Sequence, residues 1–167
     1  MTMLDLDPWA FDQTDKGWRS LVRLSAGAAI AALEAYAAAY LRDDKWVEAP
    51  PGEKQLDPTL LFWHLGQLLA CGGQTTEAIP RMRASHSNGR DPKWDAYVLA
   101  TIAFLEGDRT SFDKHAAGPN YNRPTLKRLA NNWGKTYNEA YALQSPERPR
   151  SNRRGGEKGG AGESSKP

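Results

Sequence analysis

The residues that could carry acid–base or metal chemistry are few and widely spaced along the chain. The three histidines, His64, His86 and His115, lie 22 and 29 residues apart. None has a second histidine or a carboxylate three or four residues away, the spacing that puts two metal ligands on one helix face. The sequence also lacks a Gly-x-Ser-x-Gly elbow, a phosphate-binding Gly-Lys-Ser loop and a His-Glu-x-x-His pair. It therefore predicts no catalytic residue, no metal site and no cofactor, and a protein that is not an enzyme.

The single cysteine, Cys71, excludes an internal disulfide and a zinc cluster built on several cysteines. It lies in an apolar run, so we expect a small buried hydrophobic side chain rather than a reactive thiol. His64 is the histidine of most interest, because it follows Trp63 in the same run. A histidine that lines a groove is favoured over a general base.

Charge is distributed unevenly over the 167 residues, whose net charge is +2. From Gln144 to the C-terminus, six Lys or Arg oppose three Glu, so this tail carries +3 and the remaining residues carry −1. The tail has no aliphatic residue larger than alanine, which predicts a disordered segment over 144–167. Its Arg150 to Lys158 stretch resembles a short Arg-Gly segment that contacts RNA. We therefore keep a nucleic-acid-associated function through the tail as an alternative.

The elements that must position any site are predicted to be helices. Residues 1–14 are expected to form a loosely held arm, and 15–143 a single helical domain. Connections are expected at Pro50-Pro51-Gly52, Gly72-Gly73, 87–92 and Gly118-Pro119. Apolar residues at three- and four-residue spacing, together with these breaks, predict helices. The predicted helices cover 15–24, 26–42, 58–71, 76–86, 92–106, 109–117, 123–133 and 137–141.

Two of these helix pairs repeat each other at a spacing of 34 residues. Leu65-Gly66 is matched by Leu99-Ala100, and Gly73 by Gly107. A period of this length is typical of helix–turn–helix repeats that stack because one repeat cannot bury its own apolar face. The sequence therefore predicts an all-α fold built as a stack of antiparallel helix pairs.

The first copy resembles a tetratricopeptide repeat. Leu65-Gly66, Gly73, Ala78 and Met82 occupy the places of the family's Leu-Gly pair, turn glycine, small residue and large apolar residue. The second copy departs from the pattern at Phe112, where the family has a small residue. A third copy is suggested upstream by Gly27, Ala32, Tyr36 and Ala39, so the resemblance covers residues 16–117. It implies an α-solenoid of about three degenerate repeats with a C-terminal capping helix.

The resemblance also implies a function. In such arrays the first helices of successive repeats line a concave surface that binds a protein or peptide partner. The residues placed on that surface here are Trp63, His64, Gln67, Trp94, Tyr97 and Thr101. Burial of these aromatic rings in the core is the competing interpretation. The expected function is a protein–protein interaction module: an adaptor, a chaperone or an immunity-type inhibitor.

A second alternative uses a pocket between the central helices, near His64 and Tyr97, as an enzyme or small-ligand site. Residues 1–12 contain no Lys or Arg, which is unlike a signal peptide. The most apolar run, Ala26 to Leu41, contains Glu34 and is too short to span a membrane. We therefore expect a cytoplasmic protein with no membrane partner.

Overall fold

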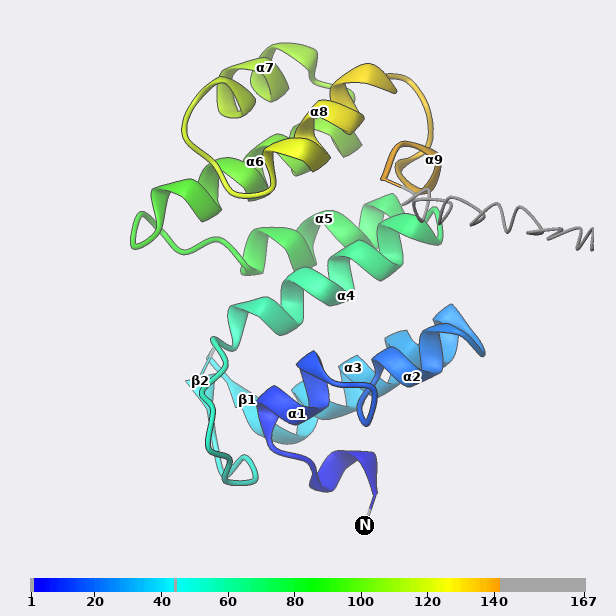
Figure 1. Cartoon of the computed structure of the whole chain (residues 1–167), viewed down its shortest axis with the longest axis vertical. Coiled ribbons are helices and arrows are strands. Elements are labelled where there is room, and N and C mark those ends of the chain that lie inside the picture. The colour runs from blue at the N-terminus through cyan, green and yellow to red at the C-terminus, as the bar shows by residue number, and fades with distance from the viewer. Residues whose placement is uncertain (1, 44, 142–167) are drawn as a thin grey trace, which may run out of the picture.

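The computed structural model describes residues 2–43 and 45–141, and the predicted disordered tail lies outside these residues. The described part is mostly helical, which confirms the all-α class (Figure 1). Its strands form one two-residue hairpin, in which β1 (Leu41–Arg42) pairs antiparallel with β2 (Lys45–Trp46). The helices are η1 (Met3–Asp5), α1 (Pro8–Gln13), α2 (Arg19–Val22), α3 (Ala26–Tyr40), α4 (Thr59–Cys71), α5 (Thr75–Ala84), α6 (Pro92–Glu106), α7 (Arg109–Ala117), α8 (Arg123–Asn131) and α9 (Tyr137–Tyr141).

The N-terminal segment packs closely on α3. Asp7 caps α1 by accepting the Trp9 and Ala10 N–H groups, and Pro8 occupies the first helical position. The Phe11 ring stacks on Tyr36 at a centroid distance of 3.8 Å. The Tyr36 hydroxyl donates to the Leu6 carbonyl at 2.7 Å. The segment 1–14 was expected as a loose arm, but its described residues form η1 and α1, and Leu6 and Phe11 belong to the core.

The central pair, α4 and α5, is joined by a short turn in which Gly73 has a φ of +78°. The two helices approach most closely at Gly66. A Cβ atom on this residue would lie 2.6 Å from Cγ of Met82 and 3.1 Å from the Met82 backbone nitrogen. Only glycine therefore fits this contact without a shift of α5. The expectation that Gly66 is small because two helices meet there agrees with this geometry.

The second pair, α6 and α7, is joined at Gly107, whose φ is +73°. Phe112, which the repeat pattern would make small, is buried against Phe104 and Trp133, with centroid distances of 6.4 and 5.2 Å. In Figure 1, α6, α7 and α8 lie at one end of the molecule and α1 to α3 at the other, with α4 and α5 between them. Among the described residues, no helix is both long enough and apolar enough to cross a bilayer.

Candidate functional site

The aromatic residues expected on a concave face meet between α4 and α6. The Trp63 ring lies 5.2 Å from that of Trp94 and 4.9 Å from that of Tyr97. Trp63 is 3% exposed and Tyr97 is 1% exposed. Trp94 is half-buried, and its indole N–H donates to the Ser85 carbonyl at 2.7 Å. Thr101 is fully buried and donates to the Tyr97 carbonyl.

These positions correct the expected aromatic groove. Trp63, Tyr97 and Thr101 belong to the core in this structure, because the rings bury their area against one another in tilted and edge-on contacts. Buried side chains offer a partner almost no surface. The part of the proposed set that remains accessible is Trp94, His64 and Gln67, and binding of a partner by these residues stays a prediction.

His64 and Gln67 lie on a different side of α4 from Trp63, against α2. Here the structure has a cavity of about 470 Å³. This volume falls within the range of roughly 300–1,000 Å³ typical of small-ligand sites. The cavity is lined by Trp18, Arg19, Val22, Arg23, His64, Gln67, Leu68, Cys71 and Tyr141. Tyr97, which was expected near His64 in a central pocket, is not among these residues.

A buried carboxylate holds the His64 ring at the cavity wall. Asp12 is fully buried, and its Oδ1 lies 2.8 Å from His64 Nδ1 and 2.9 Å from the indole nitrogen of Trp18. Its Oδ2 accepts from the Gln13 side-chain amide. Because an indole N–H can only donate, Asp12 acts as an acceptor here, and we assign the His64 proton to Nδ1. The other ring nitrogen, Nε2, then faces the Arg19 guanidinium.

Arg19 is held in one orientation by its neighbours. Its Nε donates to the Asp12 carbonyl at 2.5 Å, and one Nη lies 3.5 Å from His64 Nε2. Its Cζ lies 4.5 Å from the centre of the Trp18 ring, a cation–π contact. A guanidinium has five N–H donors, so donors remain for a ligand. Arg23, one helical turn further on, adds a second, exposed cation to the cavity lining.

The opposite wall carries polar groups on an apolar surface. The Gln67 amide donates to the Tyr141 hydroxyl at 3.0 Å and lies 3.5 Å from that of Tyr137. Burial raises the pKa of the Cys71 thiol. Since the thiolate is the nucleophile, a raised pKa makes Cys71 a poor one at neutral pH. The sequence-based expectation of an unreactive cysteine is consistent with this direction.

The arrangement at His64 is suited to hold an anion. An imidazole fixed by a buried carboxylate is also how a general base is positioned. In this site, however, Nε2 is directed at a guanidinium, which is a donor and not a proton source or sink. Arg19 and Arg23 add two positive charges to the cavity lining.

The remaining histidines lie elsewhere. His86 Nε2 is 3.7 Å from the Asp95 carboxylate, at the start of α6. Burial lowers the pKa of His115, and the nearby Lys114 and His86 cations lower it further. Among the described residues, no group of three or more His, Cys, Asp and Glu side chains is arranged to hold a metal ion.

Sequence reasoning found His64 and Gln67 and missed Asp12, Trp18, Arg19 and Arg23. Asp12 is 52 residues from His64, so no local spacing connects them. One signal was available: Asp12 follows Trp9-Ala10-Phe11, and a carboxylate in such an apolar segment requires a buried donor. Comparisons of this chain with protein-family models, with curated proteins and with solved structures each found no match.

Proposed function

We propose that this protein is a helical binding module, and that the cavity between α2 and α4 receives an anionic group of its ligand. The observation that carries the proposal is the orientation of Arg19 by the Asp12 carbonyl, the Trp18 ring and His64. A guanidinium ordered before binding loses less conformational entropy when it takes up a carboxylate or phosphate. Arg23 supplies a second positive charge at the same opening.

The ligand presents an apolar part beside this anion. Trp18, Val22 and Leu68 line the cavity next to the cations, and Val22 is 42% exposed. An apolar carboxylate has this chemistry, and so does the C-terminus of a peptide that ends in an apolar residue. The peptide would make the protein an interaction module, as the repeat pattern favours, and a small carboxylate would make it a small-ligand binder.

We also propose that α4–α5 and α6–α7 are two copies of a tetratricopeptide-like repeat. The 34-residue spacing puts Gly73 and Gly107, both with positive φ, at the same point of each pair. The close contact at Gly66 supports the first copy, whereas the buried ring of Phe112 makes the second copy a divergent one.

The proposal is tested with Cys71 as a reporter, since this thiol lines the cavity and is the only cysteine of the chain. Because burial leaves little thiolate at neutral pH, the rate of its alkylation by iodoacetamide is measured at about pH 9, with inorganic phosphate, with benzoate, and with a peptide that has a free C-terminal carboxylate after a leucine. We expect benzoate or the peptide to slow alkylation at concentrations of about 1 mM, the weak end of specific association. The amidated peptide, which lacks the charge, should protect much less.

Two variants separate the site from general charge effects. Arg23→Gln removes a cation that lines the cavity and should weaken protection about fivefold to tenfold, as the loss of one charged contact does. Lys16→Gln removes an exposed cation outside the lining and should leave protection unchanged. Protection by the peptide alone identifies the ligand as a protein terminus, and protection by benzoate as well identifies a small carboxylate. If no anion protects Cys71, or if both variants lose protection equally, the proposal is wrong.

A further inference from the structure

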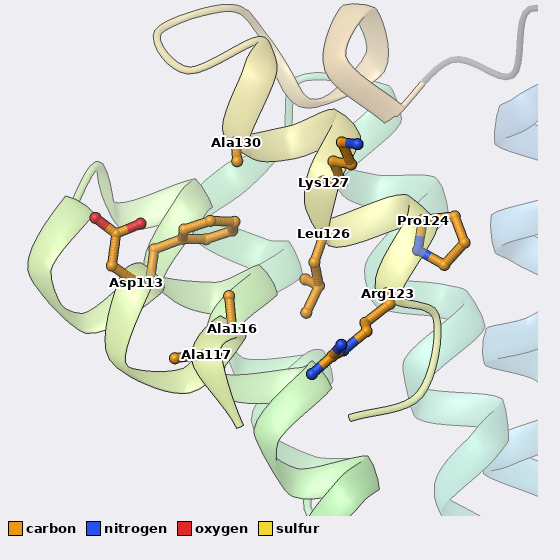
Figure 2. Close-up of a pocket in the computed structure, with 9 residues that line it drawn as sticks. Asp113, Ala116, Ala117, Arg123, Pro124, Leu126, Lys127 and Ala130 are labelled. Atoms are coloured by element: carbon orange, nitrogen blue, oxygen red, sulfur yellow. The ribbon is translucent and has the colours of Figure 1, made fainter. Parts of the chain in front are cut away.

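A second recessed surface lies at the other end of the molecule, between α7 and α8. Both helices lie against α6, and the space between them forms a groove of about 590 Å³ (Figure 2). Its floor is formed by Phe112 and Leu126, which are almost fully buried. Its walls carry Ala116 and Ala117 from α7 and Ala130 from α8. Because these side chains are single methyl groups, they leave the groove open instead of filling it.

The rim of this groove is positively charged. Arg123 and Lys127 are exposed and four residues apart on α8, so they lie on the same side of that helix. Neither forms an ion pair with another residue in the part of the chain that the structure describes. The acidic residue of the rim, Asp113, is already paired with Arg109, whose Nε lies 2.9 and 3.0 Å from its two carboxylate oxygens. The rim therefore presents two cations free to pair.

We propose that the α7–α8 groove binds an acidic amphipathic helix of a partner protein. Aliphatic side chains on one face of that helix would occupy the apolar groove, and glutamate or aspartate residues beside them would pair with Arg123 and Lys127. This is the way in which amphipathic helices are recognised by apolar grooves, with charge complementarity at the rim that selects the partner. The site is separate from the α2–α4 cavity and does not depend on the function proposed for it.

Neither the C-terminal tail nor the most exposed aliphatic pair of the described residues has this chemistry. The tail from Gln144 to Pro167 carries a charge of +3 and no aliphatic residue larger than alanine. The most exposed aliphatic side chains of the described part, Val22 and Leu24, flank the cation Arg23. A second copy that used them would bring like charges together at the rim, which disfavours self-association through this groove.

The test uses a blocked peptide of about three helical turns, with leucines at positions i and i+4 and glutamates beside them. Its binding to the full chain is followed through the backbone amide signals of the ¹⁵N-labelled protein. We expect the amides of α7 and α8 that surround the groove to shift at about 1 mM peptide, while those around the α2–α4 cavity stay unchanged. A peptide with lysines in place of the glutamates, and one with serines in place of the leucines, should each bind at least about fivefold more weakly.

Matched variants locate the contact. Lys127→Glu reverses a rim charge and should weaken the acidic peptide about tenfold, whereas Lys114→Glu, on an exposed position of α7 outside the lining, should not. Ala117→Leu fills the exposed wall without disturbing the floor and should also weaken binding. The thermal midpoint of each variant shows that it is folded. The proposal is overturned if the acidic peptide shifts no groove amides, if the lysine peptide binds as well, or if Lys114→Glu and Lys127→Glu lose binding equally.

Discussion

Two tryptophans, Trp63 on α4 and Trp18 just before α2, have different neighbours. Toward α6, Trp63 lies against the rings of Trp94 and Tyr97 and is almost completely buried. Toward α2, Trp18 lies beneath the Arg19 guanidinium and beside His64, at the wall of a cavity. Toward α6, the rings of Trp94 and Tyr97 lie over Trp63, whereas toward α2, which spans four residues, a cavity remains.

This contrast separates a side of α4 that serves packing from a side for which we propose ligand binding. The α6 side gains stability from apolar area, because ring contacts exclude water. On the α2 side, the same kind of ring orients charged groups whose donors still face solvent. Substitutions on the two sides should therefore change different quantities: unfolding free energy on the first side, and ligand binding on the second.

The largest expected effect is that of Trp63→Ala. Removal of this buried ring should lower the unfolding free energy by about 3–5 kcal/mol, since it leaves a cavity beside Trp94 and Tyr97. His64→Ala should cost less, about 1–3 kcal/mol, because it removes one hydrogen bond to Asp12 from a partly exposed side chain. Urea unfolding of both variants measures the difference. Equal costs, or a larger cost for His64→Ala, would contradict the assignment of the two sides.

Substitution of Gly66 sharpens the comparison on a third side of α4, the one that faces α5. Gly66→Leu should cost about 1–3 kcal/mol or prevent folding, because its Cβ would meet Met82 and the Ala78 carbonyl. The matched control is Gly27→Leu on α3, where a Cβ has only the Ser25 hydroxyl nearby at 3.5 Å. This control should leave stability unchanged or raise it, because leucine has the higher helix propensity. Thermal unfolding followed by circular dichroism compares the two.

The smallest expected effect on stability is that of Asp95, a buried carboxylate away from the cavity. Burial alone would raise the pKa of Asp95, but the backbone N–H of Gly89, the Ser87 hydroxyl and backbone N–H, and the His86 cation together hold it below its ordinary value of 3.8. The folded state thus binds this proton less tightly than the unfolded state. The stability that the ionised Asp95 provides is therefore complete above about pH 4 and is lost as the pH falls through the depressed pKa.

Asp95→Asn tests this pH dependence. At pH 7 the variant should be about 1–2 kcal/mol less stable than the original protein, since it weakens charge-assisted bonds to Ser87 and Gly89. The difference should shrink as the pH falls from 3.8 through the depressed pKa, because the original side chain becomes neutral first in the unfolded state and then in the folded state. Urea midpoints from pH 2 to 7 would measure it. A difference that stays constant over this range would show that Asp95 acts through its shape and not through its charge.

Much of the secondary structure was predictable from local signals. Gly73 and Gly107 end helices in left-handed conformations that suit glycine, and Pro92 occupies the first turn of a helix, whereas the helix that begins at Pro8 was not predicted. The 34-residue spacing correctly indicated two successive helix pairs, and the small residue at Gly66 indicated where the first pair touches. The glycine and proline signals act within one or two helical turns, and the helix pairs follow from a regular spacing along the chain, so these features could be predicted from the sequence alone.

The two proposed recognition surfaces depend on the tertiary structure. Trp63 and His64 are adjacent on α4, and the helical period allows each of them to face either a core or a groove. The contact of Trp63 with rings of α6, and of His64 with Asp12, gave the two side chains different surroundings. The Asp12–His64 contact joins residues 52 positions apart, and the α7–α8 groove exists because Ala116 and Ala130 face a common space. Such contacts depend on how whole helices are placed, which periodicity and capping signals do not specify.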